Sequence, residues 1–164
     1  MSFLSIDESS IEISEGIEVD IPIFPEKLGC VPTYATSNSS GFDMCAHIEE
    51  PMVIAPGKIA VVPTGCYMAI LEGFEIQIRP RSGLAIKGIT VLNAPGTIDA
   101  DYRGEIKIIL INHGESDFVI EPMMRIAQGV LAPVFRAKFH VVGNKDQLSP
   151  TKRGTGGFGH TGLK

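Results

Sequence analysis

The sequence contains no tryptophan, few aromatic residues and no excess of positive charge. With a net charge of −5 over 164 residues, it lacks the basic surface that binds the phosphate backbone of nucleic acids, although a small phosphorylated molecule needs only a few local cations. No apolar run approaches the ~20 residues that span a bilayer, and the first residues lack the basic start and apolar core of a secretory signal. We expect a cytoplasmic protein with neither nucleic acid nor membrane as a partner.

Residues that bind metals or form disulfides are also scarce. Cys30, Cys45 and Cys66 are odd in number and unevenly spaced, which favours reduced, buried thiols over a disulfide framework or a zinc site. The four histidines are scattered, without the spacing of metal ligands. A dedicated metal held directly by protein side chains is therefore not expected.

Turn-forming residues are plentiful, with 18 glycines and 11 prolines dividing the chain into short apolar runs. One run, residues 75–79, alternates strictly between polar and apolar residues, as a half-buried strand does. Many short strands between turns predict an all-β fold, a distorted jelly roll or β-sandwich. Only residues 82–87 favour a helix, which we expect to end at Gly88.

Composition also suggests how the chain is organised. Residues 1–16 are rich in serine and glutamate and are predicted to be an N-terminal extension. Residues 17–142 would form the β domain, and residues 143–164, which are polar and then glycine-rich, a mobile C-terminal arm.

The most informative segment is residues 93–104, between two apolar runs. It contains an amide side chain (Asn93), a carboxylate (Asp99) and an aromatic ring (Tyr102). Pro95-Gly96 predicts a turn, and hence a β-hairpin that carries these groups on a rigid frame. An amide can recognise the edge of a planar ring, an aromatic ring can pack against a ligand, and a carboxylate can accept a proton from water. The segment predicts a site for a small planar ligand with water chemistry nearby.

Two carboxylates compete for the role of base in this segment. Asp99 and Asp101 would face the same side of a continuous strand, and their repulsion would raise the pKa of one of them. A turn through residues 101–104 would separate them instead. We predict that Asp99 is the working group and Asp101 a solvated spectator; the alternative is that Asp99 only accepts backbone hydrogen bonds in a turn.

An anion site is predicted where a strand meets the short helix. Ser82 is a candidate N-cap, Gly83 allows close approach to the backbone, and Arg81 lies beside them. The alternative is a capped turn with a solvated arginine. Further along, Gln128 could contact a phosphate, fix another side chain or be inert, and Asp43 alone says little.

The C-terminal residues 153–162 formally match G-x-G-x-x-G, but no strand–helix unit surrounds them, so they do not predict a dinucleotide site. One interpretation is a flexible flap in which Arg153 pairs with phosphates and Phe158 packs on a ring. The other is a disordered glycine-rich end.

Taken in order, five segments resemble the motifs of the trimeric dUTPases: residues 40–44, 80–85, 93–104, 125–128 and 153–162. The resemblance implies a jelly-roll-like fold, a homotrimer with shared active sites, and Mg²⁺ bound through the triphosphate. It implies hydrolysis of dUTP to dUMP and pyrophosphate, which keeps uracil out of DNA and supplies dUMP for thymidylate synthesis. Gly129 departs from the aliphatic residue that is common there.

The resemblance also implies roles for individual residues. Asp99 would activate the attacking water, and Asp43 would help to order the water shell of the metal without binding it directly. Uracil and deoxyribose would be contacted by Asn93, Gly96, Thr97, Ile98, Asp99, Tyr102 and Lys107. The phosphates would be held by Arg81, Ser82, Gly83, Gln128, Arg153, Phe158 and Gly159, the last three from a neighbouring subunit.

Two rival functions remain at this point. The related dCTP deaminases usually have a second serine after the arginine-serine pair and lack a tyrosine after the aspartate, so Gly83 and Tyr102 argue against them. A regulatory nucleotide-binding protein without turnover is the other rival, and the presence of Asp99 and of the C-terminal motif argues against it.

Overall fold

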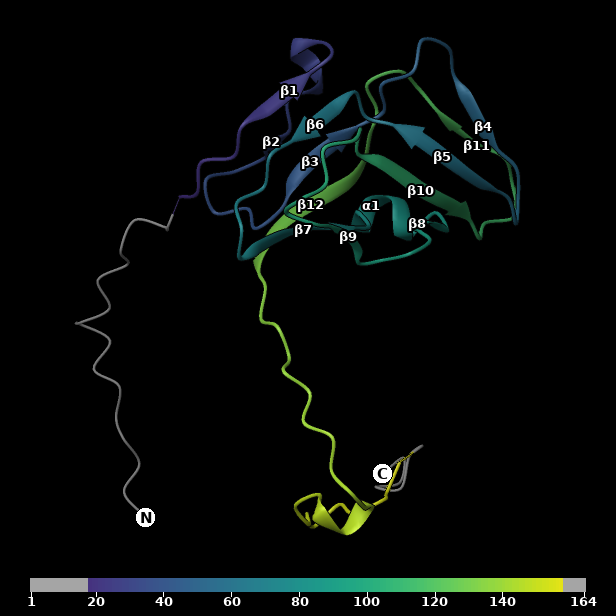
Figure 1. The fold of residues 1–164 in the computed structure, drawn as a ribbon. Coiled ribbons are helices and arrows are strands. Elements are labelled where there is room, and N and C mark those ends of the chain that lie inside the picture. Colours follow the sequence, from purple (N-terminus) through teal and green to yellow (C-terminus); the bar gives the residue numbers. More distant parts are fainter. Residues whose placement is uncertain (1–17, 158–164) are drawn as a thin grey trace, which may run out of the picture. The chain divides into compact units, whose positions relative to one another are not determined.

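The computed structural model describes residues 18–157 (Figure 1). The chain divides into two compact units, Met1–Val134 and Phe135–Lys164. Within the described residues, the first unit holds every strand and the single α-helix. These strands are β1 (Ile23–Pro25), β2 (Thr33–Tyr34), β3 (Phe42–Cys45), β4 (Met52–Ile54), β5 (Ile59–Pro63), β6 (Cys66–Met68), β7 (Phe74–Arg79), β8 (Ile89–Val91), β9 (Gly96–Ile98), β10 (Lys107–Asn112), β11 (Phe118–Ile120) and β12 (Arg125–Pro133).

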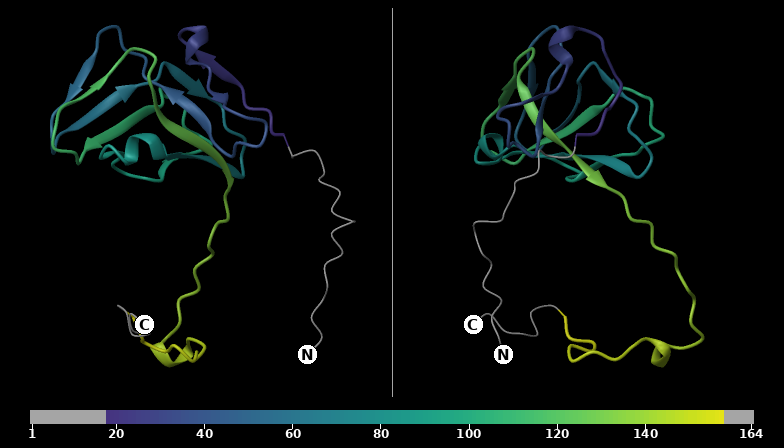
Figure 2. Two further views of the ribbon diagram at one scale, coloured as in Figure 1. Left: turned by 180° about the vertical axis from the view of Figure 1, so that it is seen from behind. Right: turned by 90° about the vertical axis from the view of Figure 1, so that its left-hand side faces the viewer.

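The strands form four antiparallel sheets. The largest has the order β2-β3-β12-β7-β9, and a three-stranded sheet has the order β5-β10-β8. Two small sheets pair β1 with β6 and β11 with β4. Figure 2 shows the arrangement from behind and from the side. The predicted all-β jelly roll with one short helix is confirmed.

One apolar core lies between these sheets. It is built by alternate residues of the strands, such as Ile76 and Ile78 in β7 and Ile108 and Leu110 in β10, all nearly inaccessible to solvent. Their neighbours in sequence point the other way, as the period of two requires. The predicted alternation of residues 75–79 is thus confirmed. Because residues within the strands fill the core, residues at the strand ends can be polar.

The helix α1 (Ser82–Ala85) is shorter than predicted, and its cap differs. Arg81, in an extended conformation, is the N-cap residue, and no side chain caps the helix, so the prediction that Ser82 is the N-cap is wrong. The chain continues in turns to Gly88, whose φ of 80° is disfavoured for other residues. A Cβ atom there would also clash with the backbone of Gly114.

The frame around residues 93–104 is a wide hairpin without a two-residue turn. Strands β8 and β10 pair in antiparallel fashion, with Val91 opposite Leu110, so the predicted hairpin between the two apolar runs is confirmed. The predicted turn at Pro95-Gly96 is wrong, because Gly96 begins β9 and pairs with Ile78 of β7. The connection therefore leaves one sheet and joins the edge of the five-stranded sheet.

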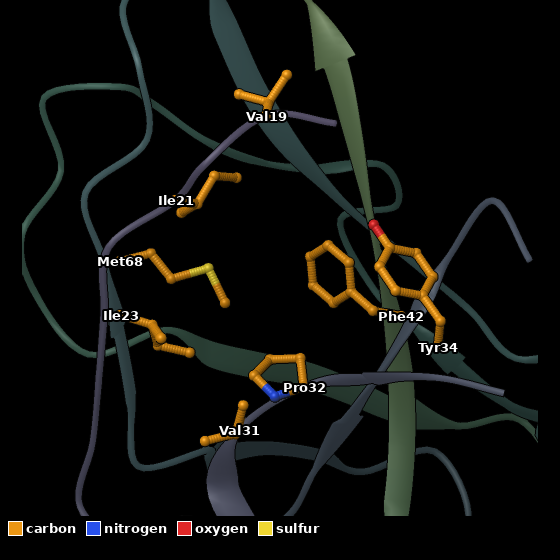
Figure 3. Close-up of a pocket in the computed structure, with 8 residues that line it drawn as sticks. All are labelled: Val19, Ile21, Ile23, Val31, Pro32, Tyr34, Phe42 and Met68. Carbon is orange, nitrogen blue, oxygen red and sulfur yellow. The ribbon is translucent and has the colours of Figure 1, made fainter. Parts of the chain in front are cut away.

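An open apolar groove borders the same large sheet. It has a volume of about 240 Å³ and is lined by side chains from the N-terminal segment, β2, β3 and β6 (Figure 3), namely Val19, Ile21, Ile23, Val31, Pro32, Tyr34, Phe42 and Met68. Tyr34 and Phe42 meet edge to face, with ring centroids 5.7 Å apart. The groove is an uncovered edge of the core.

The second unit has little regular structure over its described residues 135–157. A 3₁₀ helix, η3 (Lys145–Gln147), is closed by a capping box in which Asn144 and Gln147 exchange side-chain and backbone hydrogen bonds. Phe135, Phe139 and Val141 are each at least 90% exposed. The predicted extension 1–16, together with Phe158 and Gly159, lies outside the described residues.

Candidate active site

A polar cavity of about 320 Å³ opens where β3, β12 and the segment after β7 meet. The sheet register explains the meeting, because Gln128 lies opposite both Asp43 on β3 and Arg79 on β7. Three of the five predicted segments contribute to its lining. The lining residues are Ala35, Ser39, Ser40, Gly41, Asp43, Arg81, Ser82, Gly83, Arg125 and Gln128.

Arg81 is held in this cavity by contacts from two strands. Its Nε lies 2.9 Å from Oδ1 of Asp43, and its Nη1 donates to the carbonyl oxygen of Arg125 at 2.9 Å. The backbone just before it is also fixed, since Nε2 of Gln128 donates to the carbonyl oxygen of Pro80 at 2.9 Å. The arginine is therefore oriented by groups of the protein itself, which excludes the solvated arginine considered above.

Gln128 is not inert, and Gly41 is the reason its amide can lie where it does. A Cβ atom on residue 41 would collide with the side-chain oxygen of Gln128. Of the roles considered for Gln128, the structure shows that it fixes another group, the backbone of Pro80. Its second N–H remains available for a ligand.

Residues 99–102 form a β-turn rather than a continuous strand. The amide of Tyr102 donates to the carbonyl oxygen of Asp99 at 3.1 Å, so Asp101 lies inside the turn and the alternative of a continuous strand through both residues is excluded. The turn begins at Asp99, two residues before the turn through residues 101–104 that was considered as the alternative to a strand. The side chain of Asp99 is exposed to solvent.

The ring of Tyr102 is fixed by local contacts. Its hydroxyl donates to the carbonyl oxygen of Glu105 at 2.9 Å, and the ring covers Gly104 so closely that a Cβ atom there would collide with it. Arg103 donates to the carbonyl oxygens of Ala100 and Tyr102, at 2.6 and 2.7 Å. The ring stays 44% exposed and can present a flat surface to a ligand.

The sequence model of the dUTPase family matches residues 29–162. The chain belongs to the dUTPase family. Two curated relatives named deoxyuridine 5'-triphosphate nucleotidohydrolase come from Chlamydia caviae and Chlamydia pneumoniae and are 61% and 59% identical over 135 residues. Each alignment covers 82% of this chain and 92% of the relative. The expected family and class of enzyme are confirmed.

Solved dUTPase structures share the fold. The staphylococcal phage 80alpha dUTPase, solved with dUpNHpp, superposes with a TM-score of 0.77 at 24% identity, covering 88% of this chain and 99% of that one. A point mutant of the dUTPase from phage phi11 of S. aureus, described with a structural Mg(II) ion, gives a TM-score of 0.68 at 19% identity, covering 78% and 99%. At these identities the likeness concerns the fold alone.

The structure brings together some predicted dUTPase site residues and leaves others apart. Within residues 18–157, the cavity is lined by Arg81, Ser82, Gly83, Gln128 and Asp43, but by none of the residues from 93 to 107. Lys107 instead pairs with Glu105 at 3.4 Å. Arg153, in the second unit, donates to the carbonyl oxygen of Gly156 at 2.8 Å.

Arg125 is a cavity residue that sequence reasoning missed. Its Nη1 lies 2.9 Å from Oδ2 of Asp43. In a regular strand, residues 125 and 128 would point to opposite faces, so the pair did not suggest a common site. A register shift between Arg125 and Ala127 adds one residue to β12 against β3 and brings both side chains to the cavity. The adjacent buried pair Ile126-Ala127 is the signal that could have revealed the bulge.

All three cysteines are free thiols; Cys30 and Cys66 are buried as predicted, whereas Cys45 is only half-buried. Burial, with a smaller contribution from Cys30, raises the pKa of Cys66 to about 12. Burial and then the charge of Asp43 raise the pKa of Cys45, against a smaller opposing effect of Arg125. Both thiols therefore stay protonated at neutral pH.

No cluster of three or more metal-ligating side chains occurs within the described part of the chain. The α-helix found there has four residues, and no helix in that part is long and apolar enough to cross a bilayer.

Proposed function

We propose that this member of the dUTPase family hydrolyses dUTP to dUMP and pyrophosphate, keeping uracil out of DNA and supplying dUMP for thymidylate synthesis. The observation that carries the proposal is the cavity around Arg81, in which residues from three separate segments converge and orient a guanidinium group through contacts within the protein. The names of the relatives from Chlamydia support the choice of substrate.

The cavity is suited to the phosphate chain. Guanidinium groups form strong, charge-assisted hydrogen bonds with phosphate oxygens. Ser82 does not cap the helix, which leaves its hydroxyl for a ligand, and Gly83 has open space at its Cβ position. Together with the second N–H of Gln128, these groups would hold the phosphates.

The segment around β9 would recognise the nucleoside. The side-chain nitrogen of Asn93 lies 3.0 Å from the Cβ position of Gly96, so the amide sits against the start of β9, the edge strand of the five-stranded sheet. An edge strand has backbone N–H and C=O groups on its open side that can bond to a ligand. Uracil and cytosine differ in the donors and acceptors on their edges, and leaving buried polar groups unpaired makes rejection steep. The flat ring of Tyr102 would pack under deoxyribose and exclude a 2′-hydroxyl, and Thr97, Ile98 and Lys107 would complete the contacts.

Asp99 would act as the general base. Its carboxylate accepts a proton from water as the water oxygen bonds to the α-phosphorus, and the bond from that phosphorus to the oxygen bridging to the β-phosphorus breaks. Pyrophosphate leaves with the electron pair of that bond. The turn that begins at Asp99 anchors the base by its own carbonyl oxygen and leaves the carboxylate facing solvent.

The side chains fit Mg²⁺ that arrives with the triphosphate. Among the described residues, Asp43 is the one carboxylate that lines the cavity, and both of its oxygens already contact arginines. A carboxylate has about four lone-pair directions, so two remain to accept hydrogen bonds from the water shell of the ion. When bound, Mg²⁺ would neutralise phosphate charge.

A homotrimer with shared sites would complete the arrangement, because the uracil-recognising segment does not line the phosphate cavity of the same chain. Residues 135–141 alternate apolar and polar side chains, a pattern typical of a strand, yet Phe135, Phe139 and Val141 are exposed. We propose that this segment of one copy packs on another copy, and the apolar groove of Figure 3 is a suitable acceptor. Arg153, Phe158 and Gly159 would then close over the ligand of a neighbouring subunit.

Pyrophosphate release from dUTP, dTTP, dCTP and UTP tests the proposal. We expect dUTP to be hydrolysed far faster than the other three. Equal turnover of UTP would remove the role given to Tyr102. Release of ammonia from dCTP would favour the deaminase, and binding of dUTP without turnover would favour a regulatory protein.

A further inference from the structure

The carboxylate of Asp43 occupies an unexpected place, since it lies in a cavity proposed to bind anions. Its side chain is only 12% exposed. Oδ1 lies 2.9 Å from Nε of Arg81, and Oδ2 lies 2.9 Å from Nη1 of Arg125. A negative charge here opposes phosphate binding by Coulomb repulsion, so its presence requires another explanation.

The two arginines supply that explanation, because each would be difficult to place alone. Their side chains are 27% and 55% exposed, for Arg81 and Arg125 respectively. Long side chains lose conformational entropy when they are ordered, and two guanidinium groups repel each other. A shared carboxylate between them removes the repulsion and fixes both orientations before a ligand arrives.

We infer that Asp43 is a positioning residue of the phosphate site, holding Arg81 and Arg125 as a preformed pair of guanidinium groups. The inference rests on the proposed function and assigns Arg125, which the motif comparison left without a role, to the same site. Each guanidinium has five N–H donors, and most of them remain free for phosphate oxygens after the contacts to Asp43 and to the carbonyl of Arg125. Preorganisation lowers the ordering cost of binding.

A positioning role for Asp43 and simple electrostatics predict opposite changes in anion affinity when the negative charge of Asp43 is removed. Removing the negative charge of Asp43 should strengthen anion binding if charge alone matters. It should weaken binding if the carboxylate positions the arginines. A role limited to the water shell of the metal would weaken binding only when Mg²⁺ is present.

The experiment is calorimetric titration of inorganic pyrophosphate into the full-length protein, with Mg²⁺ and with EDTA. We expect Asp43→Asn to bind pyrophosphate about 10-fold more weakly in both conditions, because positioning is lost in both. Asp117→Asn is the matched control, since Asp117 is exposed and its replacement removes the same charge; this variant should bind as the wild type does. In turnover of dUTP, the loss should appear in KM more than in kcat.

Tighter or unchanged binding by Asp43→Asn in EDTA would overturn the inference. If that variant fails to fold, Arg125→Lys serves instead, because Arg125 is largely exposed and lysine keeps the charge but lacks the planar fork. It should bind pyrophosphate several-fold more weakly in EDTA, and wild-type affinity would overturn the inference. Failure of the wild type to hydrolyse dUTP would refute the proposed function instead, and the pyrophosphate titrations would still be decisive.

Discussion

The segment proposed to recognise uracil, residues 93–104, and the cavity proposed to bind phosphates are built over very different distances along the chain. In the first, Tyr102 bonds to Glu105 and Arg103 to Ala100, each three residues away. In the second, Asp43 contacts Arg125 across 82 residues, and Arg81 reaches the carbonyl oxygen of Arg125 across 44. A local turn can fix one region, whereas the other needs the correct register of a whole sheet.

Replacing the base in the local turn should affect chemistry alone. We expect Asp99→Asn to lower kcat by about 100-fold or more, because an amide cannot accept the proton of the attacking water. The affinity for the non-hydrolysable analogue dUpNHpp should stay near that of the wild type. Single-turnover kinetics and calorimetry measure the two quantities, and retained turnover would move the base to another residue.

Removing the C-terminal motif should affect turnover without affecting assembly. A chain that ends after Thr151 should lose on the order of 10-fold or more in kcat, because the closing groups are absent. It should keep its oligomeric state in light scattering, since residues 135–141 remain. An unchanged kcat would show that residues 152–164 take no part in turnover.

Gly41→Ala tests the long-range region through packing. The new Cβ would displace the side chain of Gln128 and release the backbone of Pro80, so kcat/KM should fall about 10-fold and unfolding free energy by about 1–3 kcal/mol. Gly143→Ala is the control, since its Cβ position meets only Gln147 at 3.5 Å. Wild-type kinetics in Gly41→Ala would mean that Gln128 does not support Arg81.

Tyr102→Phe should have a smaller effect, confined to selectivity. Loss of the hydrogen bond to Glu105 removes about 1 kcal/mol of support for the ring, so the preference for dUTP over UTP should fall about fivefold. Competition assays with the two nucleotides measure it. A preference equal to that of the wild type would show that packing alone positions the ring.

An effect of alkaline pH on stability lies outside both regions. Because burial raises the pKa of Cys66 to about 12, folding favours the neutral thiol. The stabilisation is fully present below the pKa of the thiol in the unfolded chain and is lost as pH rises from there towards 12. Denaturant unfolding should show stability decreasing above about pH 8.5, with a shallower decrease in Cys66→Ala. Equal slopes would assign the decrease to other groups.

The same contrast explains what the sequence could predict. The strand of residues 75–79 follows from a local pattern, and the structure agrees. A local turn also decides between the two arrangements considered for Asp99 and Asp101. The predictions of a helix cap at Ser82 and of a turn at Pro95-Gly96 were wrong because tertiary contacts determine both conformations. Arg81 forms an ion pair with Asp43, and Gly96 pairs with β7. Arg125 could not be assigned because its orientation depends on a register shift against β3.

The register shift in β12 allows one strand both to pack the core and to line the cavity. If β12 alternated strictly, successive side chains would point in turn to the interior and to the cavity, and Arg125 and Gln128 would point to opposite faces. With one extra residue, Ile126 and Ala127 are both buried while Arg125 and Gln128 both reach the ligand side. Core and cavity can therefore accept substitutions independently of each other, and a deletion that removes Ile126 would reduce packing without turning either polar side chain away.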